Sequence, residues 1–137
     1  LDVIGIEHRF LRDLAKRFKK QGIPEKNFIL SGTHTHSGPG TLSNRLPLQL
    51  VAVDLYKRKN YLAMLDKVTE AVQEALNRRE PADVYKSAVQ INGVQRNKFR
   101  FKDIEHYDKT ANFLLAKSKT SGHWLGGMVN FSVHGGG

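Results

Sequence analysis

An amphipathic helix between two short apolar runs constrains the fold of this chain more than any other feature. Over residues 7–21 the apolar side chains recur on one helical stripe, and lysines and arginines occupy most other positions. Gly22 stands where a helix ends, and Pro24 prevents continuation. Residues 1–6 have the pattern of a strand end and residues 27–33 that of a second strand. The opening therefore predicts a βαβ unit, and in open α/β sheets functional residues gather where such strands end.

The rest of the chain predicts a second long helix and three further strands. The expected segments are an unassigned connection over 41–59, a helix over 60–79, a loop over 95–108, and strands over 82–91, 111–117 and 123–134. The last two strands flank "SKTSG" and predict a hairpin. We therefore expect an α/β fold with a mixed sheet, a βαβ opening, two main helices and a C-terminal β-hairpin.

The composition is that of an ordinary globular domain. The chain has 137 residues, of which 39% are hydrophobic and 26% charged, enough for one domain with a core. The absence of cysteine excludes disulfides, thiolate zinc sites and a cysteine nucleophile. The chain starts at Leu1 in what looks like a strand already under way, so we expect residues 1–137 to be a single domain within a larger protein.

The charge is strongly positive. Lys and Arg number 22 against 13 Asp and Glu, a net charge of +9, which fits either nucleic acid or an anionic membrane surface. The basic residues are spread over the expected helix faces, as in solvated surfaces, so we expect no dedicated nucleic-acid role. An anionic membrane surface stays a candidate partner, and the sequence leaves the oligomeric state open.

The segment "SGTHTHSGPG", residues 31–40, carries the first candidate site. Residues two apart on a strand point to the same face, so His34 and His36 can face one pocket. Neutral imidazole is a good zinc ligand, although a His-x-His pair also occurs as polar decoration of a surface strand. Gly32 and the following Gly-Pro-Gly turn allow a close approach of backbone, which a solvated strand end does not require.

Two further residues are candidates on weaker grounds. His134 also closes an apolar strand before glycines, which would bring it to a sheet edge with the first pair, although a plain core or surface histidine fits equally well. Arg96 could bind a carboxylate or a polarised carbonyl oxygen in a fork, but its position alone does not distinguish it among the 22 basic residues.

Three segments together resemble a known family. "FILSGTHTHSGPG" closely resembles the signature of the neutral/alkaline, non-lysosomal ceramidase family, and "INGVQRNKFR" and "GGMVNFSVHGGG" resemble two later family segments in the same order. The resemblance spans nearly the whole chain. It implies that residues 1–137 are the N-terminal part of a zinc hydrolase catalytic domain.

The resemblance also implies an activity and a site. Family members are zinc-dependent amidases that split the N-acyl bond of ceramide into sphingosine and a fatty acid. His34 and His134 match the two zinc-ligating histidines, so they are the expected ligands of Zn²⁺. His36 matches a substrate-site histidine beside the metal, and Arg96 an arginine that contacts the substrate or the product carboxylate. We expect both to serve catalysis and to bind a ceramide-like lipid.

The chain departs from the family pattern in ways that leave alternatives open. The family completes its zinc site with a glutamate and a tyrosine further along, beyond residues matched here, so we expect this segment alone to bind metal weakly and to be inactive. The residues after each histidine motif also differ from the family's, which fits a member that hydrolyses another amide or an ester. A third reading is a non-catalytic basic binding module. The family habit is secreted, periplasmic or at the cell surface, and the sequence itself assigns no compartment.

Overall fold

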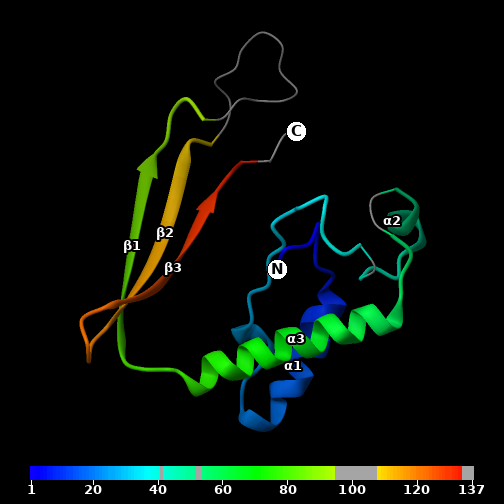
Figure 1. The fold of residues 1–137 in the computed structure, drawn as a ribbon, viewed down its shortest axis with the longest axis horizontal. Coiled ribbons are helices and arrows are strands. Elements are labelled where there is room, and N and C mark those ends of the chain that lie inside the picture. Colours follow the sequence, from blue (N-terminus) through cyan, green and yellow to red (C-terminus); the bar gives the residue numbers. More distant parts are fainter. Residues whose placement is uncertain (41, 52–53, 95–107, 134–137) are drawn as a thin grey trace. The chain divides into compact units, whose positions relative to one another are not determined.

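The computed structural model describes residues 1–40, 42–51, 54–94 and 108–133 (Figure 1). The chain divides into two compact units, Leu1–Arg78 (unit 1) and Arg79–Gly137 (unit 2). The elements are α1 (His8–Phe18), single 3-10 turns at Lys19–Gln21 and Glu25–Asn27, α2 (Leu46–Val51), α3 (Arg58–Asn77), β1 (Ala82–Gln90), β2 (Thr110–Ser118) and β3 (Trp124–Phe131). That residues 1–137 are one domain of a larger protein stays a prediction.

The core of unit 1 lies between α1 and α3. Helical spacing brings apolar side chains of both helices onto facing stripes, and there they are buried. The Phe10 ring meets the Tyr61 ring edge to face, with centroids 5.5 Å apart. Burying a side chain of this size contributes about 1.5–3 kcal/mol. The buried set is Phe10, Leu14 and Phe18 of α1 with Tyr61, Leu65 and Val68 of α3.

Polar contacts flank this core. The Tyr61 hydroxyl donates to an Asp13 carboxylate oxygen across 2.8 Å, and Lys16 donates to the other oxygen across 2.9 Å. The Lys16 hydrogen bond, followed by that of Tyr61, lowers the pKa of Asp13 below its usual value. Arg17 forms an ion pair with Asp66 at 2.6 Å. These contacts fix α1 on α3 in one register.

The end of the first helix agrees with the sequence. The α-helix passes into a 3-10 turn that ends at Gln21, and Gly22 follows with φ 73°, in the left-handed region. Glycine adopts this conformation without the steric cost of a Cβ. The expected helices over 7–21 and 60–79 are confirmed, the second as Arg58–Asn77.

The chain before α1 pairs with the chain after it in the parallel sense. Leu1 donates from its amino terminus to the Ser31 carbonyl across 2.7 Å, and Thr33 donates its N–H to the Leu1 carbonyl across 3.0 Å. His34 donates its N–H to Val3 across 3.0 Å. In a parallel pair, a residue forms hydrogen bonds with the two neighbours of the residue that it faces. Leu1 does this with Ser31 and Thr33, the neighbours of Gly32.

The order and the parallel pairing of the expected βαβ opening are therefore present, but its two extended segments are not regular strands. Neither 1–6 nor 27–33 forms a regular strand. The 3-10 turn at Glu25–Asn27 occupies the start of the second one. A left-handed backbone at His34, φ 63°, ends its extended run.

Unit 2 is a three-stranded antiparallel sheet in the order β1-β2-β3. In the register, Leu115 of β2 faces Tyr85 of β1 on one side and Gly127 of β3 on the other. The strand expected at 82–91 and the C-terminal hairpin are confirmed, and with them the α/β class. The parallel bonds lie in unit 1 and the antiparallel sheet in unit 2.

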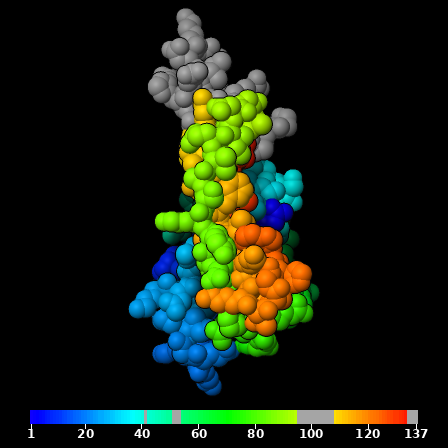
Figure 2. Space-filling model, turned by 90° about the vertical axis from the view of Figure 1, so that its left-hand side faces the viewer, coloured from blue at the N-terminus to red at the C-terminus, as the bar shows by residue number. Residues whose placement is uncertain are grey.

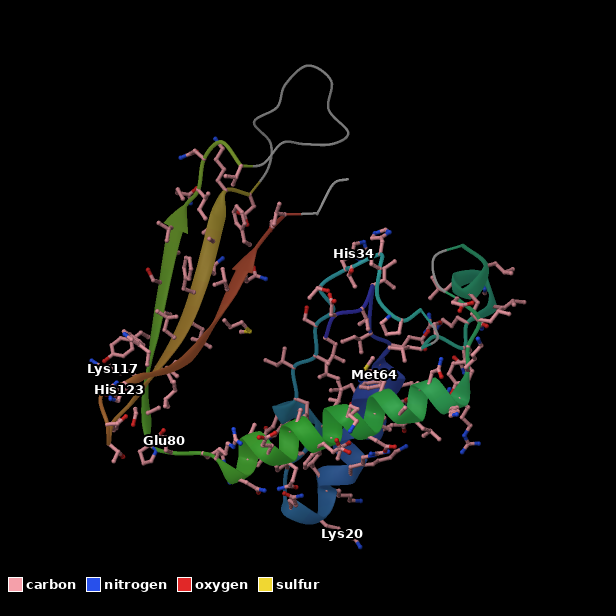
Figure 3. The ribbon with its side chains drawn as sticks, viewed as in Figure 1. Lys20, His34, Met64, Glu80, Lys117 and His123 are labelled. Atoms are coloured by element: carbon pink, nitrogen blue, oxygen red, sulfur yellow. The ribbon has the colours of Figure 1, made fainter. Side chains whose placement is uncertain are left out.

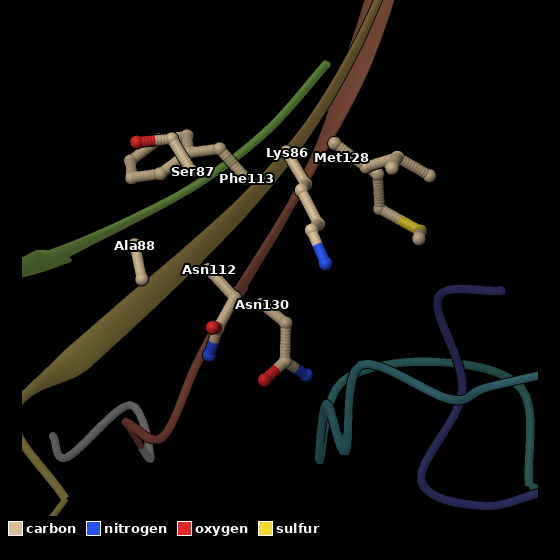
Figure 4. Close-up of a pocket in the computed structure, with 8 residues that line it drawn as sticks. Lys86, Ser87, Ala88, Asn112, Phe113, Met128 and Asn130 are labelled. Carbon is tan, nitrogen blue, oxygen red and sulfur yellow. The ribbon is translucent and has the colours of Figure 1, made fainter. Parts of the chain in front are cut away.

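Both faces of this sheet carry exposed apolar side chains, because paired residues alternate between the faces along each strand. Tyr85 and Trp124 lie on one face with their rings 5.7 Å apart. The other face has a shallow hollow of about 450 Å³, toward which Lys86, Asn112 and Met128 extend (Figure 4). Among the helices that the structure describes, none is long and apolar enough to cross a membrane.

Candidate metal centre

The loop that carries the histidine motif lies directly on residues 1–5. A Cβ at Gly32 would stand 2.8 Å from the Val3 carbonyl oxygen, and one at Gly38 would stand 2.6 Å from that of Asp2. Neither position has room for a side chain. The Thr33 hydroxyl donates to the Asp2 carboxylate across 2.6 Å, which adds a side-chain contact. The close backbone approach expected from these glycines is confirmed, and its cause is packing of the loop on the N-terminal segment.

His34 is held by main-chain groups of that segment. Its own N–H donates to Val3, and its Nδ1 atom lies 2.8 Å from the Ile4 carbonyl oxygen. A carbonyl oxygen only accepts, so Nδ1 carries a hydrogen, and in the neutral form of the ring Nε2 then carries the lone pair. Metal-binding histidines typically show this arrangement, because an oxygen that accepts from one ring nitrogen fixes both the tautomer and the orientation of the ring.

The structure brings the two motif histidines together. The rings of His34 and His36 have centroids 5.2 Å apart and stand at 87° to each other. Both residues are exposed, on the loop that Figure 3 shows around the His34 label. Their proximity was expected from the alternation of a strand. It arises instead from a loop in which His34 has a left-handed backbone and Thr35 Oγ1 accepts the Ser37 N–H across 3.2 Å.

The other two expected site residues, Arg96 and His134, lie outside the described residues. Their roles as substrate-binding residue and second zinc ligand stay predictions. Within the described ranges no three His, Cys, Asp or Glu side chains are grouped so that they could hold a metal ion. The described part of the site is thus one pair of histidines, of which His34 presents a suitable donor atom.

Sequence reasoning missed the residues that orient His34. Ile4 contributes only its carbonyl oxygen, and a main-chain acceptor leaves no signature in a sequence. Asp2 could have been noted as an acidic residue near the start of the chain, but nothing linked it to Thr33 before the two segments were seen side by side.

An exposed apolar helix follows the motif. In α2 the side chains of Leu46, Leu48 and Leu50 are 62%, 42% and 72% exposed. Such side chains on a short surface helix favour contact with an apolar ligand or partner.

Comparison with protein families gives a match over nearly the whole chain. The model of the N-terminal region of neutral/alkaline non-lysosomal ceramidases matches residues 3–136. Over 84 residues the chain is 26% identical to the neutral ceramidase of Pseudomonas aeruginosa. This match covers 61% of the chain and 12% of that protein. Over 77 residues it is 32% identical to neutral ceramidase A of Dictyostelium discoideum, covering 56% of this chain and 11% of the relative. The chain thus spans only a small part of each relative.

The fold matches a solved structure as well. The crystal structure of neutral ceramidase from Pseudomonas aeruginosa superposes with a TM-score of 0.75, at 21% identity. The superposition covers 97% of this chain and 23% of the solved chain. At this identity the likeness concerns the fold.

Proposed function

The chain belongs to the neutral/alkaline non-lysosomal ceramidase family, and we propose that it forms the N-terminal part of a zinc-dependent amidohydrolase acting on ceramide or a related N-acyl lipid. The observation that carries this proposal is the hydrogen bond from His34 Nδ1 to the Ile4 carbonyl. It directs the Nε2 lone pair of an exposed imidazole away from its backbone partner, as a zinc ligand requires.

The residues fit a zinc ion in part. His34 would supply one nitrogen through Nε2, and His134 would supply a second. Zinc bound there would lower the pKa of a water molecule toward ~7 and polarise the amide carbonyl. Two histidines leave a tetrahedral ion short of protein ligands, so this chain would hold zinc weakly without the rest of the catalytic domain.

His36 would act beside the metal rather than on it. Hydrolysis breaks the C–N bond of the amide, adds a hydroxyl group to the acyl carbon and requires a proton on the departing nitrogen. An imidazole ring can hold that proton at a ring nitrogen and pass it on. Its ring centroid lies 5.2 Å from that of His34, so the two rings would lie beside the same amide group of the substrate. Arg96 would bind the product carboxylate in a fork.

A lipid substrate is supported by α2. The exposed leucines of this helix follow the histidine motif within unit 1, and an acyl chain would cover them. The two alternatives are hydrolysis of a different amide or ester, and a basic binding module without catalysis. Each alternative predicts a result that differs from that expected for a ceramide amidase, either in zinc affinity or in substrate choice.

Zinc affinity tests the metal part of the proposal. We would titrate zinc against a chromophoric chelator in competition with the chain, its His34→Ala variant and its His36→Ala variant. We expect His34→Ala to lose at least tenfold in affinity and His36→Ala to change little, because only His34 is assigned as a ligand. Equal affinity in all three would contradict the zinc site and favour the basic binding module.

The choice of substrate tests the second part of the proposal, the hydrolysis of an N-acyl lipid. We would assay the complete catalytic domain with an N-acyl sphingoid lipid and its ester analogue, with and without added zinc. Zinc-dependent release of fatty acid from the amide, abolished by His36→Ala with zinc still bound, is the expected result. Hydrolysis of the ester alone would instead favour the family member with a different substrate.

A further inference from the structure

We propose that the outward face of α1 is a docking surface for an anionic lipid bilayer. We call Arg12, Lys16 and Lys19 the basic face. They recur every three to four residues, Arg12 and Lys16 on the side of α1 opposite its buried stripe and Lys19 at the start of the 3-10 turn that follows, and all three are exposed. The atoms of this segment, blue in Figure 2, lie at the molecular surface.

The local charge is not balanced by neighbouring acids. Residues 8–28 contain seven Lys and Arg but only two acidic residues, Asp13 and Glu25. Asp13 already accepts hydrogen bonds from Tyr61 and Lys16, and Glu25 lies 3.0 Å from His8. Within the part of the chain that the structure describes, neither Arg12 nor Lys19 forms an ion pair, so their charge is available to an anionic partner.

The basic face borders a hollow with an apolar floor. A depression of about 440 Å³ lies between α1 and the turn that follows it. All three cations line it, together with Ala15, Ile23 and Pro24. Glu25 is the acidic residue in the lining, and its carboxylate is engaged by His8. Cations around an apolar floor match a phospholipid headgroup region, where phosphate meets the first methylene groups.

The same segment favours a bilayer over a nucleic acid. Ile29, three residues after Lys26 in the sequence, is 94% exposed, and an exposed apolar side chain is stabilised at a lipid interface but not along a phosphate backbone. The apolar stripe of α1 is buried against α3, so the helix cannot insert and would bind peripherally through charge. Such attraction falls off within a Debye length.

Docking there would leave the candidate metal centre open. Lys20, which directly follows Lys19 of the basic face, lies at the opposite end of unit 1 from His34 (Figure 3). The inference goes beyond the proposed hydrolase, because binding to vesicles requires no zinc and no turnover. Failure of one can therefore be told apart from failure of the other.

Vesicle sedimentation tests the proposal. The full chain would be mixed with vesicles of phosphatidylserine and phosphatidylcholine in equal parts, and with vesicles of phosphatidylcholine alone. We expect binding to the mixed vesicles only, weakening steeply with added salt. Each cation near an anionic surface contributes roughly a fivefold change in partitioning. The variant Arg12→Gln, Lys16→Gln, Lys19→Gln should therefore bind on the order of 100-fold more weakly.

A matched control separates this surface from net charge. The variant Lys57→Gln, Arg58→Gln, Lys59→Gln removes the same charge from exposed positions at the start of α3 and should bind like wild type. The variant Arg12→Lys, Lys16→Arg, Lys19→Arg keeps the charge and should also bind, because charge and not the particular side chains determines the attraction. Equal loss in both glutamine variants, binding to phosphatidylcholine alone, or preferential binding to double-stranded DNA would each overturn the proposal.

Discussion

His34 donates its Nδ1 hydrogen to the main-chain oxygen of Ile4 across 2.8 Å, although the two residues stand thirty positions apart in the chain. The main-chain N–H of His34 donates to Val3, so backbone and ring are both held by the N-terminal segment. This double contact keeps His34 at φ 63°, a conformation that costs a residue with a Cβ roughly 1–2 kcal/mol. Strain of this kind persists where surrounding contacts determine it, and such places are often functional.

The first prediction isolates that strain. Both His34→Gly and His34→Ala remove the ring and its hydrogen bond, but only glycine adopts φ 63° without steric cost. We expect His34→Gly to be more stable than His34→Ala by about 1 kcal/mol, measured as the free energy of unfolding in urea. At Thr35, where φ is not positive, Thr35→Ala should instead be more stable than Thr35→Gly, because glycine there only increases the conformational entropy of the unfolded chain. A more stable alanine variant at His34 would contradict the left-handed backbone.

The second prediction concerns the packing of the loop on residues 1–5. Gly32→Ala would press a methyl group to 2.8 Å from the Val3 oxygen, a backbone atom that cannot rotate away. We expect a loss of about 1–3 kcal/mol in the free energy of unfolding, as in other overpacked sites.

Gly5→Ala is the matched control, because a Cβ there meets nothing within 4 Å. It should change stability by less than about 0.5 kcal/mol. The Gly32 variant should also bind zinc more weakly, since it displaces the segment that orients His34. Equal stability of the two variants would show that the loop does not lie on the N-terminal segment as described.

The helices and the hairpin were predictable, because the physical causes that form them repeat along the sequence. The buried stripe of α1 recurs every three to four residues, and Gly22 marks its end. The loop geometry at His34 was not predictable in this way. It depends on the carbonyl of Ile4 and on a single backbone angle, and neither is encoded by residue type. The short helix α2 lies in the connection over 41–59, whose apolar run shows no clear period.

A third prediction concerns the turn between β2 and β3. The hydroxyl of Ser118, which is 3% exposed, donates to Glu80 across 2.6 Å and accepts the N–H of Ser121 across 3.1 Å. Ser118→Ala removes both of these partly buried hydrogen bonds, so we expect a loss of about 1–2 kcal/mol. Faster amide hydrogen exchange in β2 and β3 would report it. Ser87→Ala, at an exposed position of β1, should leave exchange unchanged.

The last prediction follows from the lowered pKa of Asp13 between the two main helices. The hydrogen bonds from Lys16 and then Tyr61 stabilise the carboxylate in the folded state. Because the folded pKa lies below the unfolded value of 3.8, this stabilisation is complete above that value and is lost as the pH falls through the folded pKa. Wild-type stability should therefore drop as the pH falls below about 4.

Two variants separate this carboxylate from the others. Asp13→Asn cannot ionise, so its stability should be lower at neutral pH and should depend less steeply on pH over the acidic range. Tyr61→Phe removes one of the two donors and leaves Lys16 in place, so it should lose about 1.5 kcal/mol at neutral pH and show an intermediate slope. Urea unfolding at a series of pH values measures both effects. Parallel pH profiles for all three proteins would mean that Asp13 has the same proton affinity folded and unfolded, and that its contacts with Lys16 and Tyr61 do not stabilise the packing of α1 on α3.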